Sequence, residues 1–411
     1  MTATATRATG WVGVPLSHPF GLQTLPYGSM TTPGDGGPRV TVAVGDRVLD
    51  LTTASAALLP TRAALFAGGT LDGLLAAGPD VWTEVRAAIT AWLSDQRHRA
   101  TVEPLLLPAT EVTMRLPFTV ADYVDFYASE HHATNLGRLL RPGSPPLTPN
   151  WKHLPLGYHG RAGTVVVSGT PVIRPTGQRR TPGDEIVFGP STRLDFEAEL
   201  GFVVGAGSTP GRAVPLAAFE RHVFGACLVN DWSARDIQAW EYVPLGPLLG
   251  KSFATSVSPW IVPLAALTSA RTVPPPRDPR PLPYLDDTGI APWGLDITLQ
   301  VTLNGHTIAR PPFAGMYWTA AQQLAHLTSN GAALRPGDLF ASGTISGSEP
   351  GQQGSLIELT GNGHEPLTLP DGTTRTFLQD GDEVVITAAA AGPAATRIGF
   401  GEVRGRVTPS A

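Results

Sequence analysis

Residues 230–242 read Asn230-Asp231-Trp232-Ser233-Ala234-Arg235-Asp236-Ile237-Gln238-Ala239-Trp240-Glu241-Tyr242. Arg235, Gln238 and Tyr242 are separated by three and four residues, a spacing that places them on one face of a helix. With Asp231 at the start of that helix, an acid, a cation, an amide and a phenol converge as they do in a reaction site. The alternative is an amphipathic helix that Asp231 merely caps.

The apolar run just upstream, Phe224-Gly225-Ala226-Cys227-Leu228-Val229, contains the single cysteine of the chain. We interpret Cys227 as a buried small hydrophobic residue rather than a nucleophile. A lone cysteine forms no internal disulfide, so nothing in the sequence requires an oxidising compartment.

Length and composition exclude several classes of protein. A chain of 411 residues favours two domains. The low share of charged residues, 15%, indicates much buried surface and is compatible with an oligomer. The net charge of −5 gives no basic footprint for nucleic acid. The segment Met1–Arg7 has no apolar signal core and no run is long enough to span a membrane, so we expect a cytoplasmic protein.

The pattern of turns and apolar residues predicts a mainly β fold. Glycine and proline are spread along the whole chain, as in proteins of many short strands. Alternation predicts a hairpin over residues 39–51, and a helix capped by Asp80 follows. The apolar stripe expected along this helix is Trp82, Val85, Ile89, Trp92 and Leu93.

The boundary between the two expected domains falls between Leu106-Pro108 and Pro117, so the domains are residues 1–117 and 118–411. Four strands are predicted in the second domain, at residues 163–168, 200–204, 297–303 and 383–387. The alanine-rich segment 388–395 is interpreted as a flexible loop, because it contains Gly392-Pro393.

Two glycine motifs fail as nucleotide-binding motifs. Gly250-Lys251-Ser252 lacks the first glycine of a phosphate-binding loop, because Leu245 stands at that position. Gly205-Ala206-Gly207 follows a strand, but its third glycine is misplaced and no helix opens there. No zinc spacing and no serine-hydrolase elbow stands out either.

Three alternating carboxylates, Asp195, Glu197 and Glu199, follow the pattern of a strand and therefore share one face. Carboxylates in such a group repel one another unless a cation lies between them, and Ca²⁺ or Mg²⁺ is the natural partner for oxygen ligands. The alternative is a solvated face of an edge strand. The apolar residues that follow, Leu200 to Val204, argue against full exposure.

Further chemistry-bearing residues lie upstream and downstream. Asp122-Tyr123-Val124-Asp125-Phe126-Tyr127 precedes Glu130-His131-His132-Ala133-Thr134-Asn135, and histidine is the natural general base near neutral pH. The two adjacent histidines cannot both face one site. The small-residue loop 341–347 lets a ligand approach the backbone. Glu358 stands in an apolar segment that we interpret as a strand, so its carboxylate needs a partner.

Taken in order, these motifs resemble the fumarylacetoacetase family over nearly the whole chain, from about Leu22 to Gly401. The resemblance also rests on Leu156-Gly157-Tyr158-His159-Gly160-Arg161 and Pro244-Leu245-Gly246-Pro247. It implies an N-terminal SH3-like β-barrel domain, a C-terminal mixed β-roll domain and a homodimer. The implied activity is metal-dependent hydrolysis of the carbon–carbon bond of 4-fumarylacetoacetate, the last step of tyrosine and phenylalanine catabolism.

The resemblance also assigns site residues. The divalent ion, Ca²⁺ or Mg²⁺, would be bound by Asp125, Glu197, Glu199 and Asp231, whereas Asp195 falls outside the ligand set. Lys251, through its carbonyl, and Thr255 would contact a second structural Mg²⁺. The catalytic residues would be His132, Glu358, Arg235, Gln238 and Lys251. The substrate contacts would be Tyr127, Arg141, Tyr158, Gln238, Tyr242 and Thr344. One departure from the family pattern is the pair Glu130-His131 next to the implied base.

The mechanism implied by this set is a hypothesis at the level of sequence. His132, oriented by Glu358, takes a proton from water, and Arg235, Gln238 and Lys251 surround the oxyanion. Two rival interpretations keep the same scaffold. One is an enzyme that hydrolyses acylpyruvates or decarboxylates a β-keto acid, and the other is a metal-stabilised binding protein without turnover. The presence of a leading domain and an intact His132 segment favour fumarylacetoacetate.

Overall fold

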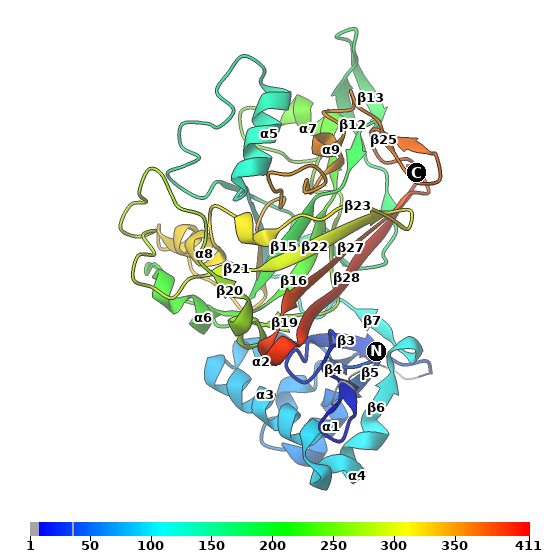
Figure 1. Ribbon diagram of the computed structural model, residues 1–411, viewed down its shortest axis with the longest axis vertical. Coiled ribbons are helices and arrows are strands. Elements are labelled where there is room, and N and C mark those ends of the chain that lie inside the picture. Colours follow the sequence, from blue (N-terminus) through cyan, green and yellow to red (C-terminus); the bar gives the residue numbers. More distant parts are fainter. Residues whose placement is uncertain (1–7, 35–36) are drawn as a thin grey trace, which may run out of the picture.

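The computed structural model describes residues 8–34 and 37–411 and shows a mainly β chain in two parts (Figure 1). The segment Met1–Arg7, where we expected no signal sequence, lies outside the described residues. The smaller part carries α1 to α4 and the strands β3 to β7, and the larger part carries the long strands (Figure 1). The expected mainly β, two-domain arrangement is confirmed.

The smaller part is an antiparallel sheet in the order β6–β5–β4–β3–β7, covered by helices. Its strands are β3 Tyr27–Thr31, β4 Arg39–Val44, β5 Arg47–Asp50, β6 Leu106–Pro108 and β7 Thr113–Arg115. Its helices are α1 Leu51–Leu58, α2 Asp72–Ala76, α3 Pro79–Ser94 and α4 Arg99–Val102. The predicted hairpin is β4–β5, and Gly45 makes its turn with a φ of +61°.

Helix α3 buries the five residues of the predicted apolar stripe. The prediction that Asp80 caps this helix is wrong. Proline fits the first helical position because its missing N–H has no partner there, so α3 already begins at Pro79 after Gly78.

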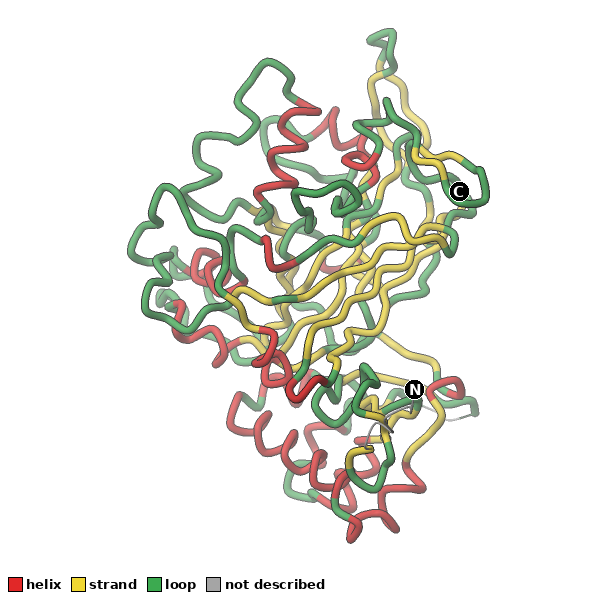
Figure 2. The backbone as a smooth tube through the Cα atoms, viewed as in Figure 1, coloured by secondary structure: helices red, strands yellow, loops and turns green. Residues whose placement is uncertain are grey.

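Two large sheets form the centre of the larger part, and their strands run side by side in Figure 2. The first has the order β10–β18–β16–β15–β24–β8–β9, with β19 beside β16. Its strands are β8 Asp122–Phe126, β9 Gly157–His159, β10 Val165–Val167, β15 Ala198–Val204, β16 Val223–Asp231, β18 Thr255–Val257, β19 Val262–Pro263 and β24 Asp338–Ala341.

The second sheet has the order β11–β28–β27–β22–β23. Its strands are β11 Val172–Ile173, β22 Ile297–Leu303, β23 His306–Ala309, β27 Glu383–Ala391 and β28 Arg397–Thr408. The helices of the larger part are α5 Glu130–Leu140, α6 Phe219–His222, α7 Arg235–Glu241, α8 Ala320–Thr328 and α9 Leu356–Leu359.

Of the predicted strands, 297–303 has the bounds of β22, and 200–204 lies within β15. The prediction for 163–168 is too long, since only 165–167 are extended and a 3-10 turn precedes them. The interpretation of 388–395 as a flexible loop is wrong for its first half. β27 continues to Ala391, because Ala389 and Ala390 pair with β22 on one side and with β28 on the other.

The first sheet is buried on both faces, which explains the unbroken apolar runs of β15 and β16. Phe202 and Leu228 belong to the core shared with the second sheet. Val203 and Val229 belong to the core shared with the smaller part. Cys227 lies on that same side at 0% exposure, so its interpretation as a buried hydrophobic residue is confirmed.

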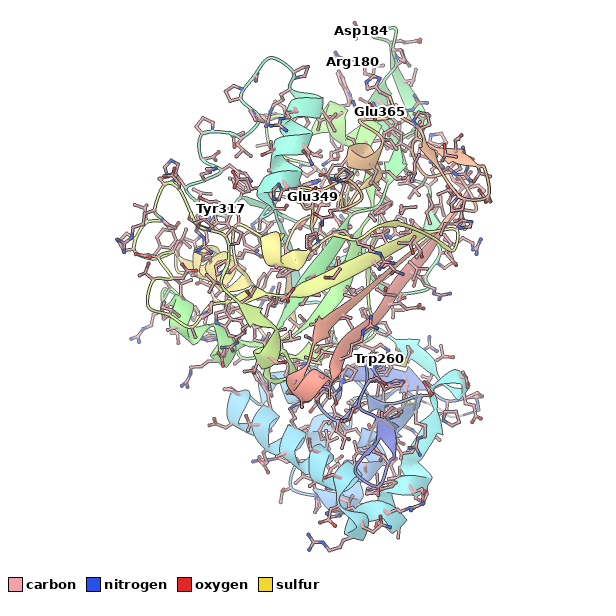
Figure 3. The ribbon with its side chains drawn as sticks, in the orientation of Figure 1. Arg180, Asp184, Trp260, Tyr317, Glu349 and Glu365 are labelled. Atoms are coloured by element: carbon pink, nitrogen blue, oxygen red, sulfur yellow. The ribbon has the colours of Figure 1, made fainter. Side chains whose placement is uncertain are left out.

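Aromatic residues join the two parts. Phe224 of β16 packs edge-on against Tyr27 at 5.3 Å and against Trp82 at 5.4 Å between ring centroids. Trp260 lies where the two parts meet (Figure 3) and packs with Met30 and Ala43. Among the described residues, none of the helices has the length and apolar character needed to cross a membrane.

We predict that Phe224→Ala lowers the free energy of unfolding by about 3–5 kcal/mol, because it opens a cavity where the parts meet. Urea unfolding followed by tryptophan fluorescence measures this change. The control is Phe188→Ala, because Phe188 is 76% exposed, and its effect should stay within about 0.5 kcal/mol. Equal losses for the two variants would contradict the packing described here.

Candidate active site

Four buried carboxylates meet where strands of the first sheet begin or end. Asp125 lies in β8, Asp231 ends β16, Glu199 lies in β15 and Glu197 directly precedes β15. Because β15 is antiparallel to β16, its start lies beside the end of β16. Each residue offers a carboxylate oxygen, and these four oxygens all lie within 4.8 Å of one another.

Cationic side chains compensate part of this charge. Nη2 of Arg235 lies 2.7 Å from Oε1 of Glu197, and Nζ of Lys251 lies 2.7 Å from Oδ2 of Asp231. Lys251 also pairs with Glu197. Burial would raise the pKa of Glu197, but the charges of Lys251 and Arg235 outweigh it and hold that pKa below its ordinary value.

The other half of the cluster has no such compensation. Among the described residues, Oδ1 of Asp125 and Oε1 of Glu199 are buried without a hydrogen-bond partner. Burial, and then the neighbouring carboxylates, raise the pKa of both acids well above the ordinary range. Four carboxylates and two cations together leave a net negative charge, which a divalent ion would balance. The oxygen ligands and the bare oxygen atoms fit such an ion.

Hydroxyl groups and a backbone N–H around the cluster donate hydrogen bonds to acids of this cluster. The Tyr158 hydroxyl lies 2.9 Å from Oδ2 of Asp125 and 2.8 Å from Oδ2 of Asp231. Thr255 donates from Oγ1 to Oδ1 of Asp231 at 3.0 Å. Gly343, just after β24, donates its N–H to Oε2 of Glu199 at 3.1 Å. Its φ is +76°, and a side chain there would meet the carbonyl of Phe126, so only glycine fits.

A histidine–carboxylate pair lies beside the cluster. Nδ1 of His132, on α5, is 2.7 Å from Oε2 of Glu358, on α9. An ionised carboxylate only accepts hydrogen bonds, so Nδ1 carries a proton, and Nε2 holds the free lone pair in the neutral imidazole. Nε2 lies 4.0 Å from Oε1 of Glu197, at the edge of the carboxylate cluster. The arrangement suits a general base that faces the metal-binding residues.

Three further side chains, which the sequence did not identify as partners, donate hydrogen bonds to Glu358. Asn135 donates to its Oε1 at 2.9 Å, and Ser346 and Ser355 donate to its Oε2 at 2.9 and 2.7 Å. Burial would raise the pKa of Glu358, but His132 and these hydrogen bonds lower it below its ordinary value. Asn135 follows His132 by three residues on α5, and this helical spacing was the available signal.

A cavity of about 390 Å³ opens over these groups. Its wall includes most of the predicted site residues, namely Asp125, Tyr127, His132, Arg141, Tyr158, Glu197, Arg235, Gln238, Tyr242, Lys251 and Thr344. The apolar part of the wall includes Leu136, Leu140, Leu156 and Leu245. Of the other predicted residues, Glu358 lies behind His132, Glu199 lies within the cluster, and Asp231 and Thr255 line a smaller adjoining cavity of about 170 Å³.

Several expectations from the sequence need correction. Asp231 does not cap α7, because that helix begins at Arg235 and Asp231 ends β16. Glu358 lies in a short helix rather than in a strand. Glu130, part of the pair that departs from the family pattern, forms an ion pair with Lys152 at 2.7 Å.

Of the three alternating acids, Glu197 and Glu199 belong to the carboxylate cluster and Asp195 does not. The N–H of Phe196 turns back to the Asp195 carboxylate at 2.8 Å. The N–H of Glu197 donates to Oδ1 of Asn230 at 3.1 Å. With these two N–H groups bonded to side chains, residues 196–197 belong to no strand and separate β14 Leu194–Asp195 from β15.

A mainly β fold with buried carboxylates for a divalent cation beside a histidine–glutamate pair defines a class of enzymes that activate water against small carbonyl substrates. The family model described as fumarylacetoacetate (FAA) hydrolase C-terminal matches residues 122–408, and that described as fumarylacetoacetase N-terminal matches residues 23–117. The chain therefore belongs to the fumarylacetoacetate hydrolase family.

Two relatives show the extent of the similarity. Human fumarylacetoacetase is 47% identical over an alignment of 408 positions that covers 95% of this chain and 96% of the relative. Fumarylacetoacetase of Arabidopsis thaliana is 44% identical over an alignment of 415 positions that covers 96% of each chain. Among solved structures, fumarylacetoacetate hydrolase from Exiguobacterium antarcticum has a TM-score of 0.55 at 16% identity and covers 94% of this chain and 99% of its own. The structural likeness supports the fold alone.

We predict that Ca²⁺ or Mg²⁺ stabilises the protein by binding the four carboxylates. At a hundred times its dissociation constant, the ion should raise the free energy of unfolding by about 2.7 kcal/mol. Thermal and chemical unfolding of the chelator-treated protein, with and without added ion, measures this.

Glu199→Gln should lose the effect of the ion, because it removes a ligand whose oxygen is bare. The exposed Glu111→Gln is the matched control and should keep it. The assignment fails if Glu199→Gln responds to the ion as the unmodified protein does.

Proposed function

We propose that the chain hydrolyses 4-fumarylacetoacetate to fumarate and acetoacetate, the last step of tyrosine and phenylalanine catabolism. The observation that carries this proposal is the His132–Glu358 pair, set at 2.7 Å and facing the four-carboxylate cluster in one cavity. Relatives called fumarylacetoacetase, similar over nearly the full chain, support the choice of substrate.

In the proposed reaction, Nε2 of His132 takes a proton from a water molecule, whose oxygen bonds to the fumaryl carbonyl carbon. The resulting oxyanion is surrounded by Arg235, Gln238 and Lys251, which all line the cavity. When the carbon–carbon bond breaks, the electron pair leaves with the acetoacetate portion, and His132 returns the proton to it. The products then carry all atoms of substrate and water.

Substrate contacts are proposed for the polar side chains of the cavity wall. Arg141 donates from Nη2 to the carbonyl of Pro146 at 2.7 Å, which holds its guanidinium at the wall. A guanidinium suits a terminal carboxylate, and the hydroxyls of Tyr127 and Tyr242 add further donors. Oγ1 of Thr344 is buried without a hydrogen-bond partner among the described residues, so it can serve a substrate oxygen.

Metal chemistry enters through the carboxylate cluster. A divalent cation, proposed to be Ca²⁺ or Mg²⁺, would be held by Asp125, Glu197, Glu199 and Asp231 and would supply Lewis-acid polarisation of the substrate. A second structural ion at Lys251 and Thr255 stays a prediction. Here Nζ of Lys251 reaches the cluster, and Thr255 donates to Asp231.

The finer architecture is part of the same proposal. We assign residues 1–117 to an SH3-like barrel domain and 118–411 to a β-roll domain. The two matched family segments, which end at 117 and begin at 122, support this division. Exposed apolar side chains, including Leu248 at 61% and Leu245 at 96%, support a homodimer. A cytoplasmic location also stays a prediction.

The test is loss of the near-ultraviolet absorbance of 4-fumarylacetoacetate, measured with chelator and with added Ca²⁺ or Mg²⁺. Rapid, metal-dependent loss is expected. An acylpyruvate and oxaloacetate serve as competing substrates in the same assay. Faster turnover of either would overturn the substrate assignment, and no turnover of any substrate by the folded, metal-bound protein would favour a binding protein.

We predict that His132→Ala lowers kcat by about a hundredfold to ten-thousandfold, because it removes the general base. The stabilisation by metal should persist, since His132 is not among the four carboxylates. His131→Ala is the matched control because His131 does not line the cavity, and its kcat should stay within about twofold. Near-normal turnover of His132→Ala with metal bound would show that another group is the base.

A further inference from the structure

Asp195, which lies outside the carboxylate cluster, accepts as many hydrogen bonds as Glu358 does. It is 0% exposed. Its Oδ1 accepts the N–H groups of Phe196 at 2.8 Å and Leu356 at 2.7 Å. Its Oδ2 accepts the N–H of Ile357 at 3.0 Å and Nε–H of Arg235 at 2.9 Å. A carboxylate has about four lone-pair positions, so these four N–H donors saturate it.

The donors come from the two sides of the proposed reaction centre. Arg235 begins α7, and its far end contacts Glu197 at 2.7 Å and Gln238 at 3.3 Å. Leu356 and Ile357 begin α9, which carries Glu358. One buried carboxylate thus fixes both the guanidinium proposed to hold the oxyanion and the helix that orients the base.

We propose that Asp195 is a positioning residue that sets Arg235 and Glu358 relative to each other across the site. The kinetic test of this inference rests on the proposed function. Asp195 touches neither the cavity nor the carboxylate cluster, so its effect passes through these two partners.

The donor set makes aspartate specific at this position. All four groups that face the side chain are N–H donors, so an amide would point its own NH₂ group at two of them. Asp195→Asn therefore keeps the shape of the side chain and loses half of its acceptors. Asp195→Glu keeps the charge and moves the carboxylate by about one bond length, and misplacements of about 1 Å can cost a hundredfold in rate.

The chain offers a matched control in Asp382. This carboxylate is 2% exposed and accepts from Nε and Nη2 of Arg375 at 2.8 and 2.9 Å. It also accepts a backbone N–H from Gln379 at 2.8 Å and does not line the cavity. Asp382→Asn breaks a buried aspartate–arginine pair of the same kind, away from the site.

The kinetic test compares these variants on 4-fumarylacetoacetate. Asp195→Asn and Asp195→Glu should lower kcat by about a hundredfold, with KM within about threefold, because positioning of reacting groups acts on the transition state. Asp382→Asn should lose thermal stability and keep kcat within about twofold. A kcat of the folded Asp195→Glu protein near that of the unmodified protein, or an equal loss in Asp382→Asn, would overturn the proposal.

A structural readout separates this inference from the proposed function. In crystal structures of the metal-loaded Asp195 variants, the Arg235–Gln238 contact or the His132–Glu358 contact should lengthen beyond about 3.5 Å, the limit of a hydrogen bond. Retention of both contacts overturns the positioning role whatever the substrate is. Absence of turnover in the unmodified protein overturns the proposed function alone, because the crystal structures still decide the role of Asp195.

Discussion

The burial of four carboxylates within a few ångströms of one another is the constraint around which the larger part of the molecule is organised. Ionised acids leave water at a large cost in free energy, so each needs a cation, a donor or a proton. Glu197 has Arg235 and Lys251, whereas Asp231 has Lys251, Tyr158 and Thr255. Asp125 and Glu199 keep one bare oxygen each, and this deficit fits a divalent ion.

The core of the sheet makes this arrangement possible. β15 and β16 are apolar on both faces, so their paths are fixed by packing against the second sheet and against the smaller part. Their polar residues are confined to the ends, where β16 finishes with Asp231 and β15 follows Glu197. Rigid strands therefore deliver the acids, while α5, α7 and α9 bring the groups that act beside them.

Local periodicity predicted the parts of the site that lie on one element. Arg235, Gln238 and Tyr242 share a face of the chain at α7, as their spacing indicated, and all three reach the cavity. Alternation alone did not separate Asp195 from the acids of the cluster, because that separation accompanies the bonding of the N–H groups of Phe196 and Glu197 to side chains. No local sequence pattern predicts such hydrogen bonds. The grouping of the four carboxylates was also beyond local patterns. The spacing of Asn135 from His132 was visible in the sequence, but its contact with Glu358, 223 residues away, was not.

Arg235 and Lys251 would each serve two purposes in the site. Arg235 and Lys251 neutralise Glu197, and under the proposed function the same groups surround the oxyanion. A divalent cation held by the carboxylates would lessen the dependence of Glu197 on Arg235 and Lys251, and their N–H groups would then be available to the reacting oxygen. Asp195 accepts Nε–H of Arg235 at 2.9 Å, a bond that does not use the Nη2 group in contact with Glu197. Under the proposed function, binding of the ion and readiness of the oxyanion site would be linked through Arg235 and Lys251.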